Sequence, residues 1–308
     1  MLGRFFLVLT GSIMLLLSAC SSDGDTQPTG SIEVITTIYP VTYFSERVGG
    51  DRVTITSLIR PGIEAHDFEP TPGDIRTIST ADVLVYVNPA FEGWVEAAVE
   101  AAEGDVIAAE TAPDADADAY ATDGAGDDGH DHGGIDPHVW LNPLDAIEQV
   151  RVIETAFARA DPDGADVYRQ NADALVAELE QLDGEFTAGL SSCKLDEIVV
   201  SHEAYGHMAE RYGLHQVALA GLSAEFESTP QKISEVIAEM RARGINYILQ
   251  EPIVSDALAK TVAAESGATI LPLTPLESLS DEAAAAGETF FTLMRENLES
   301  LRTALQCS

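Results

Sequence analysis

Short apolar runs alternate with helical patterns along the chain from Ile32 onward. The run Val83–Val87 is apolar at every position, which is typical of a strand covered on both faces of a parallel sheet. Strands that alternate with helices predict an α/β fold with parallel sheets. We expect two sets of four strands: Ile32–Ile38, Val53–Ile59, Val83–Asn88 and Val106–Ala108, then Ile198–Ser201, Val217–Ala220, Tyr247–Gln250 and Thr269–Leu273.

A long helical pattern separates the two sets of strands, from Asp166 to Leu190. Its apolar residues recur at steps of three and four and form one stripe. The stripe consists of Tyr168, Ala172, Leu175, Leu179, Leu182, Phe186 and Leu190. At ~1.5 Å per residue such a helix extends roughly 37 Å, about the length of a small domain. We therefore predict an N-terminal lobe over 32–163, a linking helix over 164–191 and a C-terminal lobe over 192–308.

The two halves of the chain share a short motif. Residues 67–72 read Asp-Phe-Glu-Pro-Thr-Pro, and residues 225–230 read Glu-Phe-Glu-Ser-Thr-Pro. In each motif the threonine suits the N-cap of a helix, and the proline that follows suits its first turn. Because the order of strands and helices around the motif is also the same, we predict two related lobes that face each other.

The beginning of the chain has the pattern of an export signal over residues 1–20. A positive charge is followed by an apolar run over 5–17, which is too short to span a bilayer comfortably. Small residues precede Cys20, as in a bacterial lipobox, in which the cysteine thiol accepts a diacylglycerol. The alternative is an ordinary secretory signal, and both readings predict an exported protein. Residues 21–31 are polar and are expected to form a flexible tether.

Acidic residues outnumber basic ones by 52 to 16, which gives a net charge of −36. A negative field repels polyanions, so this charge argues against binding of nucleic acid or anionic lipid surfaces. Residues 112–134 are rich in Asp, Ala and Gly and are expected to form a mobile loop. His130 and His132 in this loop either collect metal at the surface or belong to an inert insertion.

If Cys20 carries a lipid, Cys193 and Cys307 are the cysteines that remain. An exported protein can keep a disulfide, and two is an even number. We predict that these two cysteines pair and tie the C-terminal helix to the start of the second lobe. Two unpaired thiols are the alternative.

Three of the seven histidines lie in settings that suit metal binding. His66 follows the strand predicted over Val53–Ile59, and His202 follows the first strand of the second lobe. Ligands of parallel α/β sheets lie beyond the carboxyl ends of the strands, so both histidines are expected to face a crevice between the lobes. His138 lies between two prolines that restrict its backbone. Three neutral imidazoles that converge form a metal site in need of a fourth ligand.

A lipobox and four further motifs occur in one order along the chain. The four are Pro-Gly-x-x-x-His-x-Phe-Glu-Pro, Asp-Pro-His-x-Trp-Leu, Ser-His-Glu-Ala-Tyr-Gly and Pro-Leu-Glu-Ser-Leu. Together they resemble the metal-binding lipoproteins of the zinc/manganese ABC importers, over essentially all of Ile32 to Ser308. The resemblance implies a C-clamp, in which two β/α lobes are joined by one long rigid helix and a metal ion is buried between the lobes.

The same resemblance implies the ligand set. Carried over position by position, His66 and His138 come from the first lobe and His202 from the second, and Glu277 lies in the loop after the last strand. Manganese-type members typically pair two histidines with two carboxylates. The third histidine therefore favours Zn²⁺, with Mn²⁺ as the alternative. Glu251 is the rival carboxylate for the fourth position.

Other polar residues near these motifs are assigned supporting roles. Asp67, Glu69 and Asp136 are candidates to orient the ligand imidazoles from behind. His207 and His215 are expected to be structural.

We therefore expect an exported solute-binding protein, not an enzyme, that is anchored by lipid to the cell membrane and lies outside the cytoplasm, on the outer face of the cell or in the periplasm. It captures Zn²⁺ and passes it to an ABC permease with its ATPase subunit, and it acts as a monomer. Two other classes stay open, a zinc-dependent hydrolase and a siderophore-type metal-chelate binding protein. The chain has no His-Glu-x-x-His or Gly-x-Ser-x-Gly motif, and it is poor in Arg and aromatic residues, which weakens both.

Overall fold

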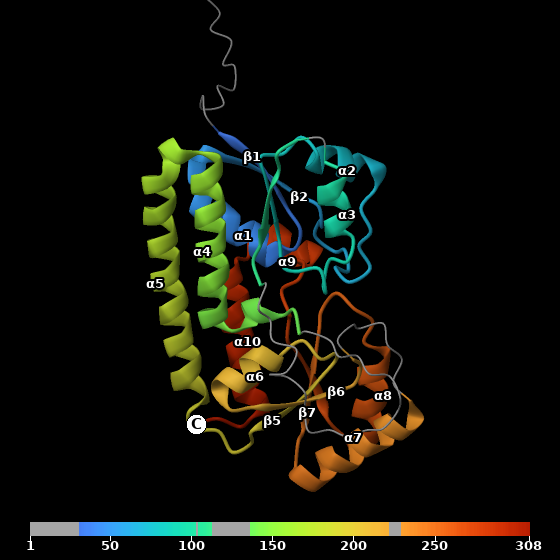
Figure 1. Ribbon diagram of the computed structural model, residues 1–308. Helices are drawn as coiled ribbons and strands as arrows, with labels where there is room; N and C mark the ends of the chain where they lie inside the picture. Colours follow the sequence, from blue (N-terminus) through green and yellow to red (C-terminus); the bar gives the residue numbers. More distant parts are fainter. Residues whose placement is uncertain (1–30, 103, 113–135, 222–228) are drawn as a thin grey trace, which may run out of the picture.

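The computed structural model describes residues 31–102, 104–112, 136–221 and 229–308. These residues form two α/β lobes, one above the other in Figure 1, with long helices along one side of both. The fold class predicted from the sequence is therefore confirmed. Cys20, His130 and His132 lie outside the described residues.

The first lobe is built on a parallel sheet in the order β2-β1-β3-β4. Its strands are β1 (Ile32–Thr36), β2 (Val53–Ser57), β3 (Val83–Tyr86) and β4 (Ile107–Glu110). The helices around it are α1 (Tyr39–Gly49), α2 (Pro72–Ile78), α3 (Val95–Glu100) and α4 (Pro143–Ala160). Alternate residues of β3 point to opposite faces, so Val83 and Val85 pack with α1 and α4, and Leu84 and Tyr86 pack with α2 and α3. Both faces of the sheet are thus covered, as the apolar sequence of β3 predicts.

The second lobe repeats this arrangement with the strand order β6-β5-β7-β8, again parallel. Its strands are β5 (Glu197–Val200), β6 (His215–Ala218), β7 (Tyr247–Gln250) and β8 (Thr269–Pro272). Its helices are α6 (Gly206–Tyr212), α7 (Pro230–Arg243) and α8 (Ala257–Ser266). Val199 and Ile248 pack with α7 and α8, whereas Val200 and Leu249 face the core shared with the first lobe.

The Thr-Pro pair at the end of the repeated motif has the same structural role in both lobes. Thr71 caps α2 by accepting hydrogen bonds from the backbone of its first turn, and Thr229 caps α7 in the same way. Each is followed by a proline in the first turn of the helix. The shared motif and the shared strand order agree with the prediction of two related lobes.

Most strand boundaries differ from those predicted by one or two residues, and three of them have a clear physical reason. β1 ends earlier than expected, because α1 begins at Tyr39 with Pro40 in its first turn. β4 continues to Glu110, which is still paired with β3. β6 begins at His215, which pairs with Glu197 of β5, although the apolar run begins later. In the last two cases strand pairing extends the strand past the apolar residues that indicate it.

The predicted linking helix is α5 (Ala165–Leu190), which would extend roughly 39 Å at ~1.5 Å per residue. It packs against α1 and α4 of the first lobe and against α6 and α10 (Phe290–Ala304) of the second. Six residues of its apolar stripe are fully buried: Tyr168, Ala172, Leu175, Leu179, Leu182 and Phe186. Short helices complete the described chain: η1 (Gly50–Arg52), η2 (Val139–Leu141), η3 (Pro162–Gly164) and α9 (Asp281–Ala286).

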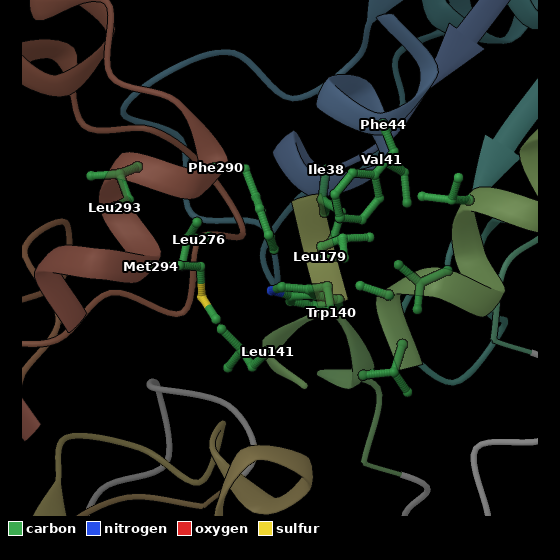
Figure 2. Close-up of a cluster of buried hydrophobic side chains, with 14 of the residues drawn as sticks. Ile38, Val41, Phe44, Trp140, Leu141, Leu179, Leu276, Phe290, Leu293 and Met294 are labelled. Carbon is green, nitrogen blue, oxygen red and sulfur yellow. The ribbon is translucent and has the colours of Figure 1, made fainter. Parts of the chain in front are cut away.

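A buried cluster joins the two lobes. Figure 2 shows Trp140 of η2 in one cluster with Leu276 and with Phe290 and Met294 of α10. Trp140 comes from the first lobe, whereas the other residues follow the second sheet in the chain. All of them belong to one continuous core that also includes the buried stripe of α5. The lobes are therefore packed together as well as linked by the chain.

Cys193 and Cys307 form a disulfide in the structure, as predicted. The bond ties the segment after α10 to the segment between α5 and β5. Among the described residues, no helix combines the length and the apolar character that crossing a membrane requires.

Candidate metal centre

Each of the predicted ligand residues lies next to a helix or in a loop that follows a strand, near the boundary between the lobes. His66 lies in the loop after β2, and His138 directly precedes η2. His202 lies two residues beyond the end of β5, and Glu277 lies in the loop after β8. This loop, residues 273–280, is called the Glu277 loop below. The carboxyl ends of β2, β5 and β8 thus supply three of the four side chains, as expected for parallel sheets.

The four side chains meet at one point. One ligand atom from each lies within 4.8 Å of the others. Glu277 Oε1 is 3.3 Å from His66 Nε2, 3.0 Å from His138 Nε2 and 3.5 Å from His202 Nε2. His138, His202 and Glu277 are almost completely buried, whereas the His66 side chain remains 13% exposed. Solvent therefore reaches the cluster on the side of His66.

Two of the three imidazoles have a carboxylate behind them. His138 Nδ1 lies 2.7 Å from Asp136 Oδ1 in a hydrogen bond, and the backbone N–H of His138 donates to the same oxygen. His202 Nδ1 lies 3.1 Å from Glu251 Oε2, within ion-pair distance, although its ring N–H is not aligned for a hydrogen bond. In both rings Nδ1 faces a carboxylate, so Nε2 is left to face the centre of the cluster.

The buried charges of the cluster are those of acids and imidazoles. Among the described residues, no Lys or Arg forms an ion pair with Asp136, Glu251 or Glu277. Burial lowers the pKa of His138, but its bonds to Asp136 and Glu277 outweigh burial and raise the pKa to about 9. Burial likewise lowers the pKa of His202, but the carboxylates of Glu251 and Glu277 outweigh burial and raise this pKa to about 10. The carboxylates of the cluster thus favour the protonated imidazoles, and a metal cation that replaces these protons would have the same attraction.

The pKa of each carboxylate in the cluster depends on the other carboxylates and on the imidazoles. Burial raises the pKa of Glu277, but the three histidines outweigh burial and hold this pKa well below its ordinary value. Burial raises the pKa of Glu251, and the charge of Glu277 raises it further. Burial and the charges of Glu277 and Glu251 also raise the pKa of Glu64 to about 7. Glu277 is therefore the carboxylate most strongly held in its ionised form.

The Glu277 loop follows the second sheet but is held largely by the first lobe. Tyr39 N–H donates to Glu277 O at 2.9 Å, Gly62 N–H donates to Leu279 O at 2.7 Å, and Trp140 Nε1 donates to Pro275 O at 2.6 Å. All three donors belong to the first lobe. These bonds fix Glu277, the predicted fourth ligand, to the lobe that carries His66 and His138.

The loop is also held at its start and has a special backbone conformation. The buried side chain of Asn297 in α10 makes two hydrogen bonds to the backbone of Thr274, at 2.9 and 2.7 Å. Leu276 has a φ of 60°, in the left-handed region that is unfavourable for a branched residue. Its side chain is fully buried in the core between the lobes. Packing of Leu276 therefore maintains the turn that points Glu277 at the histidines.

The remaining polar residues named from the sequence lie at different distances from the cluster. Glu251, the rival fourth ligand, lies behind His202 rather than among the four converging atoms. Asp67 and Glu69 are exposed. His215 is exposed at the start of β6.

His207 is buried and connects the lobes. Its Nε2 lies 3.0 Å from Asp136 O, and its Nδ1 lies 3.2 Å from Asp145 Oδ2 in α4. The helix that carries His207 is α6 of the second lobe, so the side chain joins this lobe to the segment that carries His138. Sequence reasoning missed this bridge and the bonds of the Glu277 loop, because most of their acceptors are backbone carbonyls, which leave no pattern in the sequence.

The donor set fits a zinc ion. Zn²⁺ prefers four ligands in a tetrahedron, with nitrogen and carboxylate oxygen at ~2.0–2.2 Å. Ligand atoms at such distances lie roughly 3.3 Å apart, given tetrahedral geometry. The distances from Glu277 Oε1 to the three Nε2 atoms, 3.0 to 3.5 Å, match that spacing. Three neutral imidazoles and one carboxylate also leave a net charge of about +1 on the bound ion, which the acids behind the histidines offset.

A family model described as "Zinc-uptake complex component A periplasmic" matches residues 34–304. The chain belongs to this family. Zinc-binding lipoprotein AdcA of Streptococcus pneumoniae strain R6 is 34% identical over 309 residues, which cover 97% of this chain and 60% of AdcA. High-affinity zinc uptake system protein ZnuA of Bacillus subtilis is 32% identical and is covered over 97% of both chains. The chain thus spans about 60% of the length of AdcA and nearly all of ZnuA.

Solved structures agree with this family membership. The Zn(II)-bound ZnuA-like domain of Streptococcus pneumoniae AdcA has a TM-score of 0.75 and 33% identity, and the match covers 90% of this chain and 99% of that domain. The metal-dependent lipoprotein YcdH of Bacillus subtilis has a TM-score of 0.74 and 32% identity, with 89% and 99% covered. The two-lobe α/β fold is therefore the fold of known metal-binding members of the zinc-uptake component family.

Proposed function

We propose that this chain is an extracytoplasmic solute-binding lipoprotein that captures Zn²⁺ and delivers it to an ABC importer. The observation that carries the proposal is the convergence of His66, His138, His202 and Glu277, with ligand atoms within 4.8 Å of one another. Membership in the zinc-uptake component family supports it, and so do the zinc-binding names of the relatives AdcA and ZnuA.

The site suits capture of a hydrated cation. Three of the four proposed ligands are buried, so a bound ion exchanges its water for protein ligands, while the partly exposed His66 offers the first contact. Imidazole nitrogen favours Zn²⁺ over Mn²⁺, which prefers oxygen ligands. Mn²⁺ is therefore the less favoured cargo.

The proposed site is a carrier rather than a catalyst. Catalytic zinc sites keep an open position for water or substrate, with three ligands from the protein. Here three histidines and Glu277 together supply the four ligands of a tetrahedral zinc ion. This donor set gives no support to a hydrolase. It also favours a free ion over a metal chelate, whose own donors would occupy the coordination sphere.

The segments outside the two lobes are proposed to help deliver the captured Zn²⁺ to the importer. Residues 1–20 are proposed as a lipoprotein signal, with Cys20 as the lipidated residue, and 21–31 as the tether that keeps the lobes near the membrane. A membrane permease and its ATPase subunit are the proposed partners, and the protein is proposed to act as a monomer. His130 and His132 stay candidates for an auxiliary metal-collecting loop.

Zinc uptake by cells tests this function. A strain that lacks the gene is complemented with the wild-type chain, with His202→Ala or with the control His215→Ala, and ⁶⁵Zn accumulation is measured in zinc-limited medium. We expect the wild type and the His215 variant to restore uptake and the His202 variant to fail at equal protein levels. Uptake that is independent of the gene, or restored fully by the His202 variant, would contradict the proposal.

A further inference from the structure

Glu251 is a buried acid at the metal centre that the proposed ligand set does not use. It directly follows β7, and only 2% of the residue is exposed. Neither of its carboxylate oxygens has an aligned hydrogen bond among the described residues. An ionised carboxylate without partners is costly to bury, so its position calls for a cationic or hydrogen-bonding neighbour.

The nearest such neighbour is the back of the His202 ring. Glu251 Oε2 lies 3.1 Å from Nδ1, and the other ring nitrogen, Nε2, lies 3.5 Å from Glu277 Oε1. The two nitrogens of an imidazole point in different directions, so Glu251 lies on the side of the ring away from the converging ligand atoms. The same arrangement exists at His138, where Asp136 binds Nδ1 and Nε2 faces Glu277.

We propose that Glu251 is a positioning residue for His202: its carboxylate accepts the Nδ1–H of the ring and so directs the Nε2 lone pair to the metal. This inference rests on the proposed function, since it concerns the same site. A carboxylate behind a ligand histidine fixes the tautomer of the ring and strengthens its bond to the metal. Glu251 is thereby assigned to the support of a ligand and not to the ligand set.

The backbone holds Glu251 and His202 on paired strands. Strands β5 and β7 are neighbours, and Ser201 N–H donates to Leu249 O at 2.9 Å. Ser201 Oγ also accepts the backbone N–H of Glu251 at 3.3 Å. The ligand and its carboxylate therefore belong to one sheet and move together with the second lobe.

The two supported histidines come from different lobes. Asp136 and His138 belong to the first lobe, and Glu251 and His202 to the second. Among the described residues, the His66 imidazole makes its only hydrogen bond to Glu277. Each lobe thus contributes one histidine with a carboxylate behind it. His202 Nδ1 and Glu251 Oε2 are already within hydrogen-bond distance, at 3.1 Å, so only their alignment has to change for the bond to form.

Metal binding by matched variants tests the proposal. Zinc affinity, from chelator competition, and the visible spectrum of the Co²⁺-loaded protein are compared for wild type, Glu251→Gln, Glu277→Gln and the control Glu197→Gln. Glu197 is a buried acid of β5 that pairs with Arg243 Nη1 at 3.0 Å. We expect Glu251→Gln to bind zinc about 10–100-fold more weakly while its Co²⁺ bands stay at the wild-type wavelength.

The other outcomes would overturn the assignment. Wild-type zinc affinity in Glu251→Gln would show that the carboxylate does not support His202. A Co²⁺ spectrum shifted as in Glu277→Gln would show that Glu251 is itself a ligand. Equal loss of affinity in Glu197→Gln would show a general effect of removing a buried charge.

The proposal can also be tested on the wild-type protein, without any variant that could fail to fold. Nitrogen-15 NMR of the zinc-loaded chain with labelled histidine reports which ring nitrogen binds metal and which carries a proton. We expect His202 to bind through Nε2 and to keep an Nδ1 proton that is protected from exchange with water. Binding through Nδ1, or rapid exchange of that proton, would contradict the role of Glu251. If the wild type binds no zinc at all, the proposed function fails, and this failure is distinct from the others.

Discussion

At the scale of residues, the Nε2 atoms of three histidines face one carboxylate oxygen, Glu277 Oε1. A proton or a metal ion can lie between these atoms, and both compete for the same lone pairs. The pKa of His138 is raised to about 9 and that of His202 to about 10, so both rings carry an extra proton at neutral pH when no metal is bound. Zinc must displace these protons to bind.

Zinc affinity is therefore expected to fall as the pH falls. Below the raised pKa values each displaced proton lowers the apparent binding constant about tenfold per pH unit. With protons displaced from both His138 and His202, we expect a decrease of about a hundredfold per unit between pH 7.5 and 5.5. Chelator competition across this range measures the decrease, and calorimetry in buffers of different ionisation enthalpy counts the released protons. An affinity that does not change over this range would contradict coordination by histidine.

The four converging residues could be proposed from the sequence because each lies in a recognisable motif, and His66 and His202 also follow predicted strands. The rule for parallel sheets brings His66 and His202 to one crevice, and the family resemblance supplies His138 and Glu277. The role of Glu251 was not predictable in the same way. Its place after β7 makes it a candidate, but only the orientation of the His202 ring separates a ligand from a residue behind a ligand.

At the scale of elements, the Glu277 loop is the segment whose position matters most. It follows β8 of the second lobe, yet its backbone accepts hydrogen bonds from Tyr39, Gly62 and Trp140 of the first. Leu276 adds a left-handed turn that packing between the lobes maintains. Of the proposed ligands, His66, His138 and Glu277 are thus held largely by the first lobe, whereas His202 is held by the sheet of the second.

Replacing Trp140 by phenylalanine is expected to loosen this loop. Phenylalanine fills most of the buried space but cannot donate to Pro275 O, so a buried carbonyl loses its partner at a cost of about 1–3 kcal/mol. We expect zinc affinity to fall about tenfold, together with a lower melting temperature. Trp94→Phe is the control, since Trp94 packs on Phe68 in the outer part of the first lobe. Equal zinc affinity in the two variants would contradict the role of this hydrogen bond.

The element order was predictable from the alternation of apolar runs and helical patterns, and the stripe of α5 identified the linking helix. The ends of β4 and β6 were less predictable. Glu110 and His215 are polar and do not indicate a strand by themselves. Each belongs to a strand because it pairs with a residue of the neighbouring strand. Sequence patterns report burial, whereas strand boundaries depend on hydrogen bonds to another part of the chain.

At the scale of the whole molecule, the lobes are held together by α5, by a shared core and by side chains that cross between them. His207 is one of these, with Asp136 O and Asp145 Oδ2 as its partners in the first lobe. Because Asp136 also binds His138, this contact connects the second lobe to a proposed ligand.

Removal of His207 is expected to speed the release of zinc. Loss of its contacts weakens the packing of the lobes around the site by about 1–2 kcal/mol, which corresponds to roughly 5- to 30-fold in rate. Stopped-flow measurement of zinc transfer to a fluorescent chelator compares His207→Ala with His215→Ala, whose histidine is exposed. Identical rates in the two variants would show that this contact does not hold the lobes closed.

The disulfide between Cys193 and Cys307 is expected to stabilise the folded molecule as a whole. Cys193 and Cys307 are 114 residues apart in the chain, so their bond restricts a long loop in the unfolded protein. We expect Cys307→Ser to lower the free energy of unfolding by about 2–5 kcal/mol. Denaturant unfolding of the metal-free protein measures the loss, and reduced wild type is the control. Unchanged stability in both would contradict a stabilising role.

Metal content tests the central claim most directly. The protein is purified without chelators, and zinc and manganese are measured by elemental analysis for wild type, His138→Ala and the control His215→Ala, followed by competition between the two ions. The account predicts one zinc per chain in the wild type and in the His215 variant, loss of this zinc in His138→Ala, and preference for zinc over manganese. No stoichiometric metal in the wild type, or zinc that the His138 variant retains, would contradict it.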